Sequence, residues 1–203
     1  MKTQKGLILS LLIIFISSHN FAQTVKEFND NGMAKAKAND YSGAILEYNK
    51  AILIDSTKST IYYNRAISKS KLNDLNGAIS DFSRSINLNN DPNTYYARAL
   101  MKVELSNYKG ALEDFDKSFE VKKTSSSFYF LRGTCKFILK DYSSSMDDLN
   151  KAIELKSDNA KAYFSRAQIE IILKQNDKAC IDFKKAKELG YLKAEEFIIK
   201  NCN

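Results

Sequence analysis

Small and large apolar residues alternate along this chain with a period of about 34 residues. Five successive segments begin near residues 25, 59, 92, 126 and 160, and in each an aromatic residue is followed four places later by a residue with little or no side chain. Residues four apart share one face of a helix, so each segment is predicted to open with a helix that is bulky at one level and bare at the next. The pairs are Phe28 and Gly32, Tyr62 and Ala66, Tyr95 and Ala99, Tyr129 and Gly133, and Tyr163 and Ala167.

A second helix is predicted in the latter half of each segment. In the second segment, for example, small Ala78 and Ser85 flank large Phe82 on one face. Large residues opposite small ones let two helices approach closely and interdigitate. The residues expected to end the first helix and cap the second with a side-chain oxygen are Asp40, Asp74, Asn107 and Asp141.

These repeated positions resemble the tetratricopeptide repeat family over about residues 25–190. The resemblance implies an all-α fold, a right-handed superhelix of about five antiparallel helix pairs with a concave inner face. We assign residues 23–190 to this array. Gly190 is a good helix terminator, and residues 191–203 are expected to form a capping helix over the last apolar face.

The first 22 residues have the pattern of a secretory signal peptide. Lys2 and Lys5 precede the apolar stretch Leu7–Ile16, and cleavage is expected after Ala22. The stretch is too short to span a bilayer, which takes about 20 residues, so no transmembrane segment is expected after cleavage. The alternative is a retained amphipathic anchor. Loss of the two lysines lowers the formal charge from +7 to +5.

The cysteines are consistent with an exported protein. Cys180 precedes Gly190 by ten residues and Cys202 follows it by twelve, so two antiparallel terminal helices would bring their sulfurs together as a disulfide. The alternative is two buried thiols. The segment from Ala179 to Cys202 also resembles the C-terminal ending of exported repeat proteins of Bacteroidetes-type bacteria, which implies a periplasmic or cell-surface location. Cys135 is expected to be a packed thiol.

The composition argues against an enzyme. The only histidine is His19, inside the predicted signal peptide, so the mature chain has no histidine for a general base, a catalytic triad or a metal site. Three dispersed cysteines do not form a zinc site, and there is no glycine-rich phosphate loop. No cofactor is expected. Acidic residues interleave with the lysines and arginines, so nothing indicates a nucleic-acid partner.

The resemblance implies that the first helices line the groove and that the residue after each opening aromatic faces it. Four such positions hold rings, at Tyr63, Tyr96, Phe130 and Phe164. The apolar residues expected beside them are Ile67, Leu100, Phe137 and Ile171. An exposed strip of this kind would anchor a peptide or helix. The alternative is that the rings are buried against the next repeat.

Arginine and aspartate recur together in the last four segments. The arginines are Arg65, Arg98, Arg132 and Arg166, and the aspartates, sixteen places later in each case, are Asp81, Asp114, Asp148 and Asp182. We expect a ladder of ion pairs between packed helices, bidentate where the geometry allows. The alternative is a row of arginines that binds anionic ligands.

Together these features predict an exported, non-enzymatic scaffold that binds a peptide or helix of a partner protein in its groove. The alternative is a structural or self-associating envelope module whose groove holds no ligand.

Overall fold

The computed structural model describes residues 24–202, so the predicted signal peptide lies outside the described residues. Within residues 24–202 every regular element is an α-helix and no strand occurs. A first helix covers residues 24–37. It is followed by α2 (Tyr41–Ile54), α3 (Ser59–Lys71), α4 (Leu75–Leu88), α5 (Pro92–Glu104), α6 (Tyr108–Lys122), α7 (Ser126–Ile138), α8 (Tyr142–Leu155), α9 (Ala160–Ile172), α10 (Asn176–Glu188) and α11 (Ala194–Asn201). The all-α fold, about five helix pairs and the terminal helix are confirmed.

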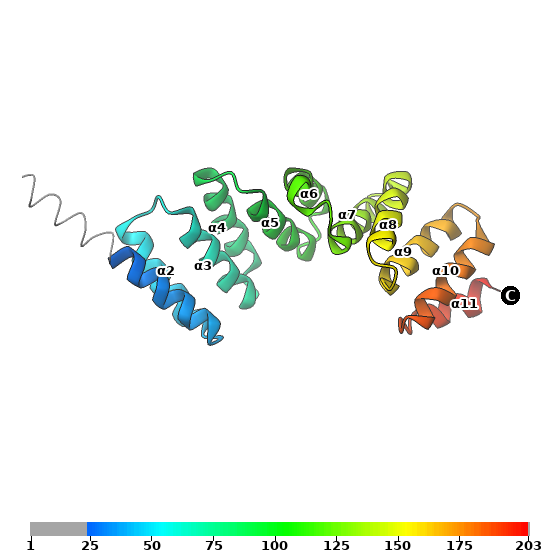
Figure 1. The fold of residues 1–203 in the computed structure, drawn as a ribbon, viewed down its shortest axis with the longest axis horizontal. Helices are drawn as coiled ribbons and strands as arrows, with labels where there is room; N and C mark the ends of the chain where they lie inside the picture. Colours follow the sequence, from blue (N-terminus) through cyan, green and yellow to red (C-terminus); the bar gives the residue numbers. More distant parts are fainter. Residues whose placement is uncertain (1–23, 203) are drawn as a thin grey trace, which may run out of the picture. The chain divides into compact units, whose positions relative to one another are not determined.

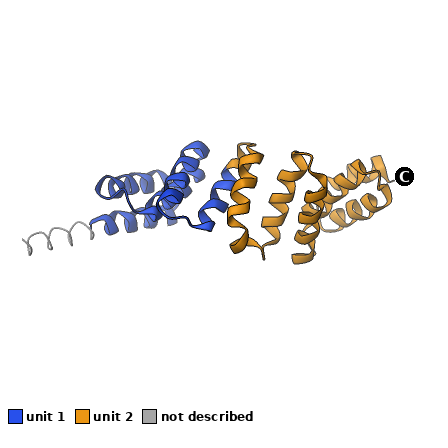
Figure 2. Cartoon of the chain, turned by 90° about the horizontal axis from the view of Figure 1, so that it is seen from above, with its two compact units in different colours: residues 1–101 blue, residues 102–203 orange. Residues whose placement is uncertain are grey.

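The helices fall into two compact units, residues 24–101 and 102–202, which are coloured separately in Figure 2. The first unit holds helix 24–37, α2, α3, α4 and most of α5, and α6 to α11 belong to the second. Within each unit, consecutive helices pack side by side (Figure 1). Each unit therefore builds its own core from neighbouring helix pairs, as expected of a repeat array.

Short turns join the two helices of each pair. A residue with positive φ ends the first helix, as at Asn39 (63°) and Asn73 (62°), and the next residue caps the second helix. Asp40 accepts a hydrogen bond from the Gly43 N–H at 2.8 Å, and Asp74, Asn107 and Asp141 act in the same way. A Cβ at Gly43 would lie 2.0 Å from Oδ2 of the capping Asp40 carboxylate, so glycine leaves room for the cap.

The cores have the predicted nesting of small and large residues. In the first unit, Phe82 is fully buried among Ala66, Ala78 and Ala97. A Cβ at Gly32 would lie 2.5 Å from the Tyr48 ring, so this pair of helices requires the missing side chain. The periodic apolar pattern thus defines which faces of the helices meet.

Candidate binding faces of the first helices

Three of the recurring arginines, Arg65, Arg132 and Arg166, lie between helices and contact the aspartates sixteen places later. Arg65 donates from Nε and Nη2 to the two oxygens of Asp81, at 2.8 and 2.6 Å, and Lys69 Nζ lies 2.8 Å from the same carboxylate. Arg132 with Asp148 and Lys136, and Arg166 with Asp182, form the same bidentate pairs. Asp114 is paired with Lys102 at 2.8 Å. Each aspartate is buried, so these are the strong, charge-assisted kind of hydrogen bond.

The same guanidinium groups also reach back to the preceding repeat. Arg65 Nη1 donates to Asn49 Oδ1 at 2.6 Å, and Arg166 Nη1 donates to Asn150 Oδ1 at 2.8 Å. The Arg166 guanidinium also lies 5.4 Å from the Tyr163 ring centroid. The hydrogen bond to Asp182 raises the pKa of Arg166 above its usual value. With their donors used in this way, the arginines tie successive repeats together, which favours the structural interpretation over an anion site.

The four predicted groove rings are not equivalent. Tyr63, Tyr96 and Phe130 are half-buried, whereas Phe164 is only 5% exposed. The Tyr63 ring packs against Phe82 with centroids 5.6 Å apart, so one side of it belongs to the core. Burial also raises the pKa of Tyr63 and of Tyr96. Tyr63, Tyr96 and Phe130 are therefore partly buried and partly exposed to solvent, which lies between the two alternatives of an open strip and a buried core.

Phe164 is the exception because the C-terminal segment covers it. Its ring centroid lies 4.9 Å from that of Phe197 on α11 and 4.8 Å from that of Tyr191, which precedes α11. The expectation that Phe164 faces an open groove is not met in this conformation. The apolar residues expected beside the rings, Ile67, Leu100, Phe137 and Ile171, are all half-buried.

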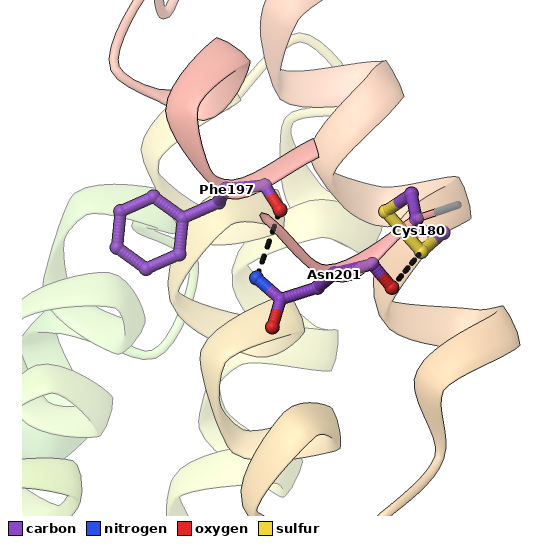
Figure 3. Close-up of a disulfide and its surroundings, with 4 residues drawn as sticks. Cys180, Phe197 and Asn201 are labelled. Atoms are coloured by element: carbon purple, nitrogen blue, oxygen red, sulfur yellow. Dashed lines mark hydrogen bonds between the residues drawn. A yellow bond between two sulfur atoms is a disulfide. The ribbon is translucent and has the colours of Figure 1, made fainter. Parts of the chain in front are cut away.

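A covalent link holds α11 in place. Cys180 on α10 and Cys202, the residue after α11, form a disulfide with Cα atoms 5.5 Å apart. Figure 3 shows the Asn201 amide donating to the Phe197 carbonyl oxygen at 2.8 Å, while the Asn201 carbonyl lies 3.4 Å from the Cys180 sulfur. Cys135 is a buried free thiol whose pKa burial raises to about 11, so it is a packing residue without thiolate reactivity.

Open pockets adjoin the half-buried rings in each unit. The pocket beside Tyr63 measures about 550 Å³ and lies within the first unit. Asparagines from three successive first helices line it, Asn29, Asn64 and Asn93, together with Asp91. The sequence interpretation missed this pocket, although the asparagine-rich segment before α5 was a visible signal.

The second unit has pockets of different character. The pocket beside Phe130 measures about 500 Å³, and Lys156 and Lys161 line it. A smaller pocket of about 240 Å³ lies beside Phe137 and Ile171, with Lys200 at its wall. Both are close to where the sequence predicted a binding strip.

The residues that the structure describes include no candidate metal site and no candidate membrane-spanning helix. In residues 24–202 no three histidine, cysteine, aspartate or glutamate side chains are arranged to hold a metal ion. None of the described helices has both the length and the hydropathy that crossing a membrane requires.

The fold and the repeated residues define a stacked array of helix hairpins. The model of the tetratricopeptide repeat (TPR) matches residues 59–92, 126–159 and 160–189. These three segments are therefore tetratricopeptide repeats, and the other two segments have the same register. No curated protein sequence matches it.

Solved structures with the same fold include two of MamA and one of YrrB. A MamA protein superimposes with a TM-score of 0.76, covering 90% of this chain and 97% of that chain at 20% identity. MamA from Desulfovibrio magneticus RS-1 has a TM-score of 0.76, 82% and 94% coverage, and 16% identity. YrrB, described as a TPR protein with an unusual peptide-binding site, has a TM-score of 0.77, 84% and 92% coverage, and 17% identity. At these identities the likeness establishes the fold alone.

Proposed function

We propose that this chain is a non-enzymatic scaffold that binds a peptide or helix of a partner protein on the face formed by its first helices. The observation that carries the proposal is the set of half-buried rings, Tyr63, Tyr96 and Phe130, each on a first helix. Half-buried rings are rigid anchors because the core already restrains them, and their solvent-exposed part offers apolar area to a partner. Open pockets beside Tyr63 and Phe130 add room for a ligand's side chains.

Further support comes from the family and from the arginines. TPR proteins bind peptide or protein segments, and YrrB carries a peptide-binding site by its description. The arginines, which would otherwise be the obvious ligands for an acidic tail, are used in the ladder between repeats. The ring face is therefore the better candidate for recognition.

A panning experiment followed by a binding measurement tests this function. We expect a random-peptide library panned on the full chain to yield binders. A Tyr96→Ala, Phe130→Ala double variant should weaken the selected peptides at least about tenfold, because each compact unit loses an aromatic anchor. Fluorescence anisotropy of labelled peptides measures the affinity, and circular dichroism checks that the variant is folded.

The control is a double variant of apolar residues on second helices that line none of the described pockets. Leu53 is 86% exposed on α2 and Ile181 is 67% exposed on α10, so Leu53→Ala, Ile181→Ala removes apolar surface of the same kind elsewhere. Equal loss of binding in both double variants would refute a site on the first-helix face.

The second candidate function is a structural or self-associating module. Two observations favour it: α11 already covers Phe164, and the second helices and the C-terminal segment expose apolar side chains such as Leu53, Ile181 and Leu192. A dimer in analytical ultracentrifugation that the Leu53→Ala, Ile181→Ala variant abolishes would support this alternative.

We also propose that the protein is exported, with cleavage after Ala22. A disulfide between Cys180 and Cys202 is typical of oxidising compartments. The positively charged start and apolar stretch of the first 22 residues support the same location.

A further inference from the structure

We propose that the pocket of the first unit binds an extended peptide segment and takes one lysine or arginine side chain of that segment against Asp91. The proposal rests on the function proposed above, because Tyr63 belongs to both sites. It goes beyond that function by choosing an extended ligand over a helix and by assigning the ligand a positive charge.

The amide side chains of the pocket favour an extended ligand. Asn29, Asn64 and Asn93 line it, and Asn64 Nδ2 donates to Asn29 Oδ1 at 3.3 Å. A carboxamide has two donors and two acceptor positions, so these groups retain unused capacity. An extended segment presents main-chain N–H and C=O groups that match this capacity. A helix satisfies its main-chain groups internally and would leave the amides without partners.

The charge of the pocket favours a cation. Asp91 is the only acidic residue in its lining, and no lysine or arginine lines it. Asp91 Oδ1 accepts from the Asn93 N–H at 3.1 Å and from Asn93 Nδ2 at 3.2 Å, and Oδ2 accepts from Thr94 Oγ1 at 3.3 Å. None of the ion pairs within residues 24–202 involves Asp91. A carboxylate has about four acceptor positions, so one remains for an incoming ammonium or guanidinium group.

Tyr63 supplies the second half of the cation site. It lines the same pocket as Asp91, and its pKa is raised chiefly by burial and further by the charge of that carboxylate. A lysine or arginine that pairs with Asp91 therefore enters the pocket that the Tyr63 ring also lines, where its aliphatic stem meets apolar surface.

The neighbouring lysines do not cancel this charge. A smaller pocket shares Asn29 with the first and is lined by Lys26 and Lys58. Lys26 is paired with Asp30, and Lys58 lies 3.2 Å from Asp55. The pockets of the second unit differ, because lysines line both of them. The preference for a cation is therefore a property of the first unit.

The test uses pools of blocked nonapeptides whose central residue is arginine in one pool and citrulline in the other, with randomised flanking positions. Citrulline has the shape of arginine without its charge. Fluorescence anisotropy with the full chain should show the arginine pool binding about tenfold more tightly, as expected for a hydrogen bond to a charged group. The difference should shrink as salt is added.

Two matched variants locate the effect. Asp91→Asn keeps a capping oxygen for the Asn93 N–H but removes the charge, so it should abolish the preference for arginine. Asp74→Asn makes the same change in the cap of α4, which lies outside the pocket, and should keep the preference. A preference that survives in Asp91→Asn overturns the proposal.

The remaining outcomes separate this inference from the proposed function. If both pools bind equally and Tyr63→Ala weakens that binding, the cation site is overturned and the proposed function stands. Absence of binding by either pool overturns the pocket proposed here, whereas the panning experiment described above decides the proposed function by itself. A hydrocarbon-stapled helical form of a selected arginine peptide should bind more weakly than the linear form, and equal binding overturns the extended conformation.

Discussion

Glu170 occupies a position where three other repeats have lysine. Lys69, Lys102 and Lys136 lie at the equivalent place, and each pairs with the buried aspartate of its repeat. Glu170 instead lies near Asp182, and it is 5% exposed. Its Oε2 is the buried side-chain oxygen without a hydrogen-bond partner in the described part of the chain. The last repeat therefore has a like-charge contact where its neighbours have an ion pair.

The proximity of Glu170 to Asp182 predicts that Glu170 lowers the stability of the fold by an amount that depends on pH. Burial raises the pKa of Glu170, and the Asp182 charge raises it further, while Arg166 and Lys178 act against the shift. A raised folded-state pKa means that Glu170 stabilises the fold below its unfolded pKa of about 4.5 and that this contribution is lost as pH rises through the higher folded value. Near neutral pH the ionised, unpaired group costs stability.

We therefore expect Glu170→Gln to raise the free energy of unfolding by about 1 kcal/mol at pH 7, because a neutral amide replaces an unsatisfied buried carboxylate. The gain over the unmodified chain should vanish toward pH 4. Urea denaturation between pH 4 and pH 8 measures both. Glu196→Gln, at an exposed position of α11, is the control and should change little. A Glu170→Gln variant that is less stable at every pH would contradict the explanation.

At the scale of elements, α11 is a short helix that depends on its attachments. It has eight residues, too few for a stable isolated helix. Its Ala194 is fully buried, and Phe197 packs against Phe164 and Phe183. The disulfide adds a covalent tether between residues 22 apart.

Loss of that tether should loosen the cap. We expect Cys202→Ser to lower the free energy of unfolding by about 3 kcal/mol, since a loop of this length is no longer closed in the unfolded chain. Hydrogen exchange should rise first in α11, and urea denaturation gives the overall loss. A thiol reductant should reproduce the effect on the unmodified protein and leave Cys202→Ser unchanged. If the urea midpoint of the unmodified protein does not change when the reductant is added, the disulfide has no stabilising role.

At the scale of the whole molecule, export connects the N-terminal pattern with the disulfide. If the first 22 residues direct secretion, the protein isolated from its native host should begin at Gln23, which N-terminal sequencing determines. Its Cys180–Cys202 disulfide should be intact in non-reducing peptide mapping.

Charged substitutions in the apolar stretch Leu7–Ile16 provide a second test of the export proposal. Leu11→Arg, Leu12→Arg should block export and leave an uncleaved chain in the cell, because charges disrupt the apolar core of a signal peptide. An uncleaved chain found in the envelope of the native host would instead favour the retained anchor.

The sequence by itself determined the local features of this protein. Helix pairs, caps and the nesting of small against large side chains all follow from spacings of a few residues, where the 3.6-residue turn leaves little freedom. Residues such as Arg65 and Asp81 lie sixteen apart within one hairpin, so the hairpin alone brings them together. Cys180 and Cys202 are paired for the same reason.

Only the tertiary structure decided which faces stay open. Phe164 has the same local sequence setting as Tyr63, but it is buried because a later segment folds back over it. The pocket of Asn29, Asn64 and Asp91 joins three repeats, and no local pattern reports how much space remains between them. Exposure depends on what the rest of the chain covers, and periodicity along the sequence does not contain that information.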